Sequence, residues 1–176
     1  SVPIGGTGGV DVTSFSTQDP LYATCLAFTD GEGNTILLYH MDLINSSGSV
    51  DFAREDISEA TGIPLQNIML AATHTHSGPT TSTTSDIMDR YRKELSAKMV
   101  SAAQAALADR KPADMFTTTT TFNNLNFVRH YNMSDGSVAG SNFGNTATND
   151  YVSHVREPDN EMQLIRFKRQ GGKDVV

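Results

Sequence analysis

The sequence predicts an α/β fold of α+β character, with a mixed, mostly antiparallel sheet and two helices packed on it. Three observations predict this class. Apolar, β-branched runs flank a turn-forming segment, two longer segments repeat apolar residues at helical spacing, and further β-branched runs follow in the second half. A chain of 176 residues is also long enough to bury a substantial core.

A hairpin is expected near the start of the chain. Residues 21–29 and 35–43 are apolar runs, and the segment DGEGN between them has the composition of a tight turn. The two strands should therefore be antiparallel neighbours. A shorter strand is expected before them, at residues 10–13.

Two helices are expected, with a third strand between them. The first helix spans residues 50–61, with Ser49 as its N-cap and a Gly and a Pro just beyond its end. The second spans residues 86–109 and carries an apolar stripe. Between the helices, residues 67–73 form a short apolar strand that leads directly to His74.

The second half of the chain contains shorter elements. The sequence predicts strands over residues 115–122, 126–133 and 162–168, and a long loop over 137–150. After the last of these strands a QGGK turn precedes residues 174–176, which resemble the opening of a partner strand. We therefore expect this chain to be a fragment of a longer protein.

The net charge argues against a nucleic-acid partner, and the hydropathy argues against a transmembrane segment. The net charge is −7 and no run of basic residues occurs, so a nucleic-acid partner is not expected. No segment approaches the roughly 18 consecutive apolar residues of a membrane span. The single cysteine, Cys25, lies in an apolar stretch and is expected to be a buried, inert thiol.

The strongest chemical signal is the pair His74 and His76, directly after the third strand. In an extended chain a spacing of two places both imidazoles on one side. Histidine nitrogens bind zinc, and a catalytic zinc site commonly combines three protein ligands with an open position for water. The pair is thus a candidate for half of a metal site, with the hydroxyls of Thr73, Thr75 and Ser77 available to orient the rings.

Residues 67–79, NIMLAATHTHSGP, closely resemble the histidine motif of the neutral/alkaline ceramidase family. Weaker similarity surrounds this motif at GVDVT (9–13), MDL (41–43) and GIP (62–64), so the resemblance covers most of residues 5–80. It implies zinc-dependent hydrolysis of an N-acyl, lipid-type or small-molecule amide, with Zn²⁺ as the cofactor. It is compatible with a secreted or periplasmic protein as well as with a cytoplasmic one.

The resemblance also implies roles for individual residues. His74 would be a zinc ligand, and His76 would face the substrate and stabilise charge at the scissile amide. Arg129, in a segment that partly resembles the family's Asn-Arg segment, would lie near the amide. The family's remaining ligands, a His, a Glu and a Tyr, would belong to the remainder of the parent chain beyond Val176. Independently, the position of Asp42 at a strand end makes it a candidate acceptor for an imidazole N–H.

The sequence is also compatible with two alternative functions. One is a noncatalytic binding or structural module that keeps the histidine loop. The other is a different His-x-His metallohydrolase, such as a member of the amidohydrolase group. His40, His130 and His154 match no motif and are expected to be structural or surface histidines.

Overall fold

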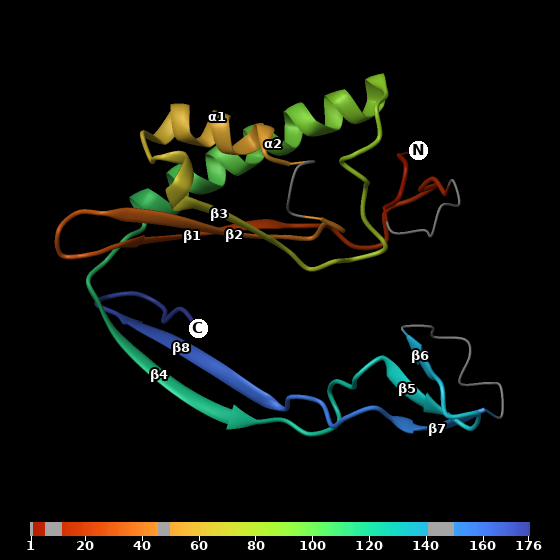
Figure 1. Cartoon of the computed structure of the whole chain (residues 1–176). Coiled ribbons are helices and arrows are strands. Elements are labelled where there is room, and N and C mark those ends of the chain that lie inside the picture. Colours follow the sequence, from red (N-terminus) through yellow and green to blue (C-terminus); the bar gives the residue numbers. More distant parts are fainter. Residues whose placement is uncertain (1, 6–11, 46–49, 141–149) are drawn as a thin grey trace. The chain divides into compact units, whose positions relative to one another are not determined.

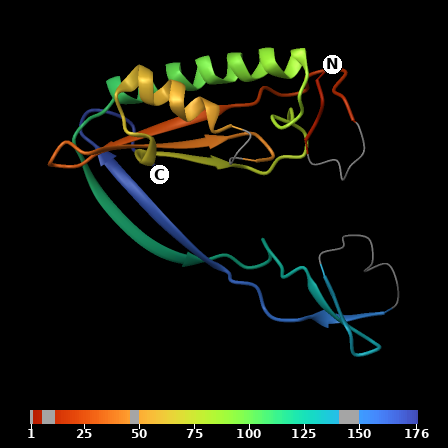
Figure 2. The ribbon, with the colours of Figure 1, turned by 45° about the horizontal axis from the view of Figure 1, so that its top comes forward.

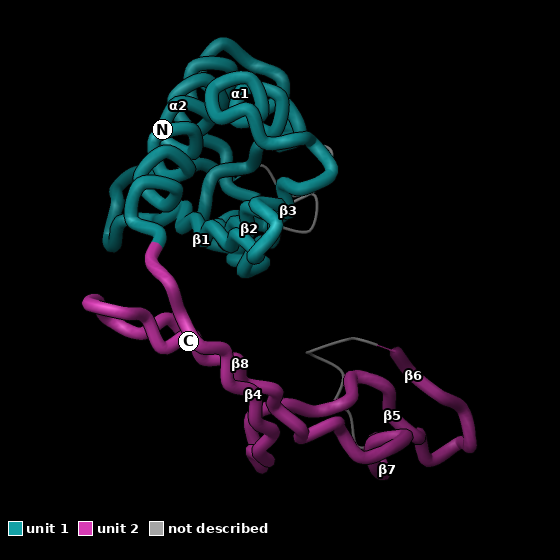
Figure 3. Tube along the Cα trace, turned by 90° about the vertical axis from the view of Figure 1, so that its left-hand side faces the viewer, with its two compact units in different colours: residues 1–110 teal, residues 111–176 magenta. Residues whose placement is uncertain are grey.

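The computed structural model describes residues 2–5, 12–45, 50–140 and 150–176. It divides into two compact units, Ser1–Arg110 and Lys111–Val176, which Figure 3 shows in different colours. Each unit is described separately below.

The first unit contains a three-stranded sheet in the order β1-β2-β3. β1 (Ala23–Thr29) and β2 (Thr35–Met41) are antiparallel, and β2 pairs in parallel with β3 (Ile68–Ala72). A parallel connection needs a long crossover, which the chain supplies through its first helix. The prediction that these three segments are neighbours in one mixed sheet is confirmed.

The hairpin turn between β1 and β2 is held by the side chain of Asp30. Its carboxylate accepts hydrogen bonds from the backbone N–H groups of Glu32 and Asn34, both at 2.9 Å. Gly33 adopts a φ of 90°, a conformation that glycine reaches without steric cost. The turn predicted from the sequence is thus formed by two of its own residues, Asp30 and Gly33.

Both helices cover the same face of this sheet (Figures 1 and 2). α1 (Phe52–Thr61) has Asp51 at its N-cap position and ends at Gly62, whose φ is 72°. The expected cap, Ser49, lies outside the described residues. α2 (Asp86–Ala108) begins at Ser85, whose hydroxyl accepts a hydrogen bond from the backbone N–H of Met88. A short 3₁₀ turn, η1 (Leu65–Asn67), precedes β3.

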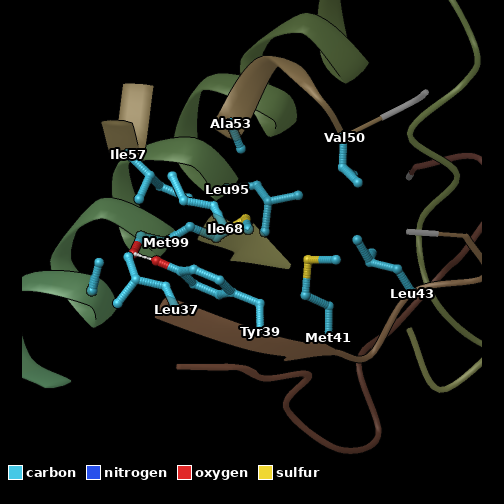
Figure 4. Close-up of a cluster of buried hydrophobic side chains, with 11 residues drawn as sticks. Leu37, Tyr39, Met41, Leu43, Val50, Ala53, Ile57, Ile68, Leu95 and Met99 are labelled. Atoms are coloured by element: carbon cyan, nitrogen blue, oxygen red, sulfur yellow. Dashed lines mark hydrogen bonds between the residues drawn. The ribbon is translucent and has the colours of Figure 1, made fainter. Parts of the chain in front are cut away.

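The hydrophobic core lies between the sheet and the helices. Leu37, Tyr39 and Met41 of β2 are fully buried, whereas Ile36, on the opposite face, is 41% exposed. Full burial of each such apolar side chain contributes about 1.5–3 kcal/mol. Figure 4 shows the β2 side chains directed towards the helices. The other buried members of this cluster are Leu43, Val50, Ala53, Ile57, Ile68, Leu95, Met99 and Ala103.

The described residues of the second unit form two small antiparallel sheets. β4 (Ala113–Thr121) pairs with β8 (Glu161–Arg169), and β5 (His130–Met133) lies between β6 (Val138–Gly140) and β7 (Tyr151–His154). Phe167 also exchanges two backbone hydrogen bonds with Val175, so the chain turns back onto β8 as the QGGK segment predicts.

Two local predictions in this unit were wrong in part. β5 covers only the last four residues of the expected strand 126–133. β6 lies inside the segment expected to be a loop, 137–150, and β7 begins just after that segment, at Tyr151. Strands of three and four residues are too short to show a two-residue periodicity, and tertiary pairing decides them. Residues 141–149 lie outside the described part of the chain, as do residues 10 and 11 of the strand expected at 10–13. Thr13 forms a bridge with Pro3.

The fold class is confirmed as α+β, with two helices and small, mostly antiparallel sheets. No helix among the described residues has both the length and the hydropathy needed to cross a membrane.

Candidate functional site

The histidine loop, residues 73–79, begins where β3 ends. The backbone N–H of Thr73 donates to the carbonyl of Met41 at 2.9 Å, which continues the β2–β3 pairing up to His74. Because β2 and β3 are parallel, the residues that follow both strands meet at the same edge of the sheet. This topology brings Asp42 and Ile44 to the start of the loop.

His74 adopts a left-handed backbone conformation, with a φ of 60°. Non-glycine residues in this region are uncommon, and those held there by their surroundings often occupy functional sites. The chain is therefore not extended at His74, contrary to the geometry expected from the sequence. The rings of His74 and His76 nevertheless meet, with centroids 5.1 Å apart and an interplanar angle of 86°. Both residues are exposed.

The His74 ring is oriented by a backbone carbonyl. Its Nδ1 lies 2.7 Å from the carbonyl oxygen of Ile44. A carbonyl can only accept, so Nδ1 carries the proton and donates it to this bond. In the neutral ring the lone pair is then on Nε2, which is the arrangement that metal-binding histidines commonly have.

The hydroxyl of Thr75 has a partner within the loop. Thr75 accepts a hydrogen bond at its hydroxyl from the backbone N–H of Ser77, at 3.2 Å, and so stabilises the turn rather than a ring nitrogen. A side chain at Gly78 would be crowded. A Cβ there would lie 3.1 Å from the carbonyl oxygen of Asp42 and 3.2 Å from Leu21 Cδ1.

Asp42 lies beside the loop, and its described partner is a backbone group. Its carboxylate accepts from the N–H of Tyr22 at 3.0 Å, and its own N–H donates to the Tyr22 carbonyl at 2.9 Å. These two bonds fasten the segment that follows β2 to the segment before β1. A hydrogen bond from an imidazole to Asp42 stays a prediction.

Arg129 belongs to the second unit, where it directly precedes β5 and is exposed. Its place near a substrate amide stays a prediction. His154 of the same unit donates from Nδ1 to the carbonyl of Val128 at 2.7 Å, and its ring packs 5.2 Å from that of Tyr131. His130 is exposed.

His40 and Cys25 lie in the sheet of the first unit. His40 is exposed on β2. Cys25 is half-buried rather than buried, and this burial raises the pKa of its thiol. A raised pKa lowers the thiolate fraction, as expected of an inert cysteine.

Among the described residues, no group of three or more His, Cys, Asp and Glu side chains is placed to hold a metal ion. A catalytic zinc commonly takes three protein ligands, of which the oriented imidazole of His74 could be one. Sequence reasoning also missed Ile44, Tyr22 and Gly5, which contact the loop or the residues beside it. Ile44 and Tyr22 act through backbone atoms, which any residue type provides, so no residue pattern could have revealed them.

The chain was compared with protein-family models, curated protein sequences and solved structures. No protein-family model matches the chain, and no curated protein sequence matches it. Among solved structures it is similar to neutral ceramidase from Pseudomonas aeruginosa, with a TM-score of 0.56 and 18% identity. The match covers 84% of this chain and 24% of that protein. The chain therefore has a fold similar to that of part of a neutral ceramidase.

Proposed function

We propose that this chain is part of a zinc-dependent amide hydrolase that cleaves N-acyl, lipid-type amides. One observation carries the proposal. The Nδ1–H of His74 is bound to the Ile44 carbonyl, which leaves Nε2 with the lone pair that a metal ligand requires, just after the end of β3. The similarity of fold to part of a neutral ceramidase supports the same reaction class.

His74 is the proposed zinc ligand in this chain. The remaining ligands would come from the remainder of a longer parent chain, because the aligned part is 24% of the ceramidase it resembles. When bound, zinc would supply the Lewis acidity that makes water nucleophilic near neutral pH. The task of His74 is to present Nε2 in a fixed direction.

His76 is proposed to contact the substrate instead of the metal. Its ring stands edge-on to that of His74 at 5.1 Å, on an exposed loop, so an amide bound next to His74 would lie within reach of it. There the imidazole would donate to the oxygen that gains negative charge in the transition state. Arg129 is proposed as a positively charged group near this amide, and Asp42 as the acceptor of a hydrogen bond from an imidazole N–H.

The decisive experiment measures zinc content and amide hydrolysis in the parent protein. His74→Ala should lose both, because removing one of a few ligands weakens zinc binding and leaves water unpositioned. His40→Ala, which removes an exposed histidine from β2, is the matched control and should change neither. Full hydrolytic activity in His74→Ala would contradict the proposal.

Two further measurements define the reaction. A panel of N-acyl amides that differ in acyl length and head group would show whether lipid-type amides are the preferred class. The 176-residue chain on its own should not cleave any of them in a zinc-dependent way, since its described residues hold no three-ligand group. Zinc retained by the parent without hydrolysis of any amide would instead favour the noncatalytic module.

A further inference from the structure

Residues 3–5 run alongside the end of the histidine loop. The N–H of Gly5 donates to the carbonyl of Gly78 at 3.0 Å, and the N–H of Thr80 donates to the carbonyl of Pro3 at 2.9 Å. Ile4 and Pro79 form an antiparallel bridge between these bonds. Residues 3–5 therefore act as a short extra strand along the end of the loop.

This segment is also fastened on its other side. Ile4 donates its N–H to the carbonyl of Val12, and the N–H of Ser14 donates to the carbonyl of Val2, both at 2.9 Å. The N–H of Val2 in turn donates to the Ser14 hydroxyl at 3.2 Å. Hydrogen bonds on both sides restrict how far the segment can move away from the loop.

The space beside Gly5 is filled by Ile44. Gly5 is buried, and a Cβ built on it would lie 2.6 Å from Ile44 Cγ2 and 3.1 Å from Ile44 Cβ. Real Cβ atoms do not approach other carbons so closely, so any larger residue would displace Ile44 or the segment. Ile44 is only 8% exposed and has little space into which to move.

Ile44 is the residue whose carbonyl holds Nδ1 of His74. We propose that residues 3–5 are a positioning element for His74, which holds Ile44 where its carbonyl accepts the Nδ1 proton. Gly5 is then a positioning residue that acts on the imidazole through Ile44. The left-handed φ of His74 agrees with this arrangement, because such a conformation persists only where neighbouring contacts maintain it.

The significance of this element rests on the proposed function, since a fixed Nε2 lone pair matters for a zinc ligand. The effect of residues 3–5 on the His74 ring can be tested separately, without metal or substrate. If the carbonyl of Ile44 moves, the neutral His74 ring loses the bond that selects its tautomer, and either nitrogen can carry the proton.

The test is long-range ¹H–¹⁵N NMR of the 176-residue chain labelled with ¹⁵N-histidine, at about pH 8.5, which is about two units above the usual histidine pKa. His74→Ala identifies the His74 signal. In the unsubstituted chain His74 should be protonated at Nδ1. In Gly5→Ala the ratio of the two tautomers should shift about fivefold, the factor that corresponds to one average hydrogen bond.

Two controls accompany this variant. Gly31→Ala places a methyl group where nothing lies within 4 Å, and it should leave the His74 tautomer unchanged. His154, which donates from Nδ1 to the Val128 carbonyl in the second unit, serves as an internal reference in the same spectrum. An unchanged His154 signal shows that Gly5→Ala has not unfolded the second unit.

A second variant removes the segment without introducing a clash. Deletion of residues 1–5 eliminates the bonds to Gly78 and Thr80, and it should also shift the His74 tautomer if the first unit keeps its helical circular dichroism. His74 that remains protonated at Nδ1 in either folded variant would overturn the positioning role. A shifted tautomer supports it. If the parent protein carrying Gly5→Ala then kept full zinc affinity, the positioning role would stand and the zinc-ligand role of His74 would fail.

Discussion

The hydroxyl of Tyr39 donates a hydrogen bond to the backbone carbonyl of Met99 at 2.7 Å, inside the core of the first unit (Figure 4). This bond joins the central strand β2 to α2, 60 residues further along the chain. Both side chains are fully buried. The contact thus holds α2 on β2. β2 is the strand that leads to Ile44, whose carbonyl accepts the hydrogen bond from His74.

Tyr39→Phe is expected to lower the free energy of unfolding by about 0.5–1.5 kcal/mol, the net contribution of one intramolecular hydrogen bond. The ring remains, so no large cavity forms. Urea denaturation measures the change. Tyr22→Phe is the matched control, because Tyr22 is 64% exposed, and its substitution should have little effect. Equal effects of the two changes would contradict a stabilising role for the buried bond.

Alkaline pH should destabilise the first unit. Burial raises the pKa of Tyr39, Tyr91 and Cys25 in the folded chain. Above the unfolded values of about 8.5 for cysteine and 10 for tyrosine, the unfolded chain binds fewer protons than the folded one, so stability falls as pH rises. Urea denaturation from about pH 7 to 11 should show this decrease. Tyr39→Phe should reduce it above about pH 10, and a flat profile would contradict the expectation.

The hairpin turn provides a pair of glycines for comparison. Gly33→Ala should destabilise the chain by about 1–2 kcal/mol, because Gly33 has a φ of 90° that alanine adopts only with strain. Gly31→Ala in the same turn meets no atom within 4 Å, and it should change stability by less than about 0.5 kcal/mol. Thermal or urea unfolding of both variants decides the point. Equal losses would mean that Gly33 does not require this conformation.

His76→Ala in the parent protein should retain most of the zinc and lose turnover. The expected loss is about 2.7–4 kcal/mol in the activation free energy, the value of a single donor to a developing oxyanion. Metal analysis of the purified variant beside steady-state kinetics separates the two effects. Zinc loss equal to that of His74→Ala would make both histidines ligands, and it would favour a different His-x-His metallohydrolase.

The sequence predicted the first unit well because its signals there are local. The DGEGN turn carries its own hydrogen-bonding side chain in Asp30, and the stop of α1 is a glycine that adopts the left-handed conformation. The alternation along β2 is also visible in the residue types, since Leu37, Tyr39 and Met41 share one face. In the second unit, β6 and β7 were not predicted, because three or four residues contain too little periodicity.

The sequence by itself determined that this chain is an α+β protein whose third strand delivers a His-Thr-His segment to a sheet edge. Only the tertiary structure decided how His74 is held: at a φ of 60°, with its Nδ1 proton on the carbonyl of Ile44 and Gly5 packed behind that residue. The physical reason is that periodicity and turn formation depend on side chains that are near one another in the sequence. A backbone carbonyl 30 residues away has no residue-type signature, and its position depends on how the separate segments pack.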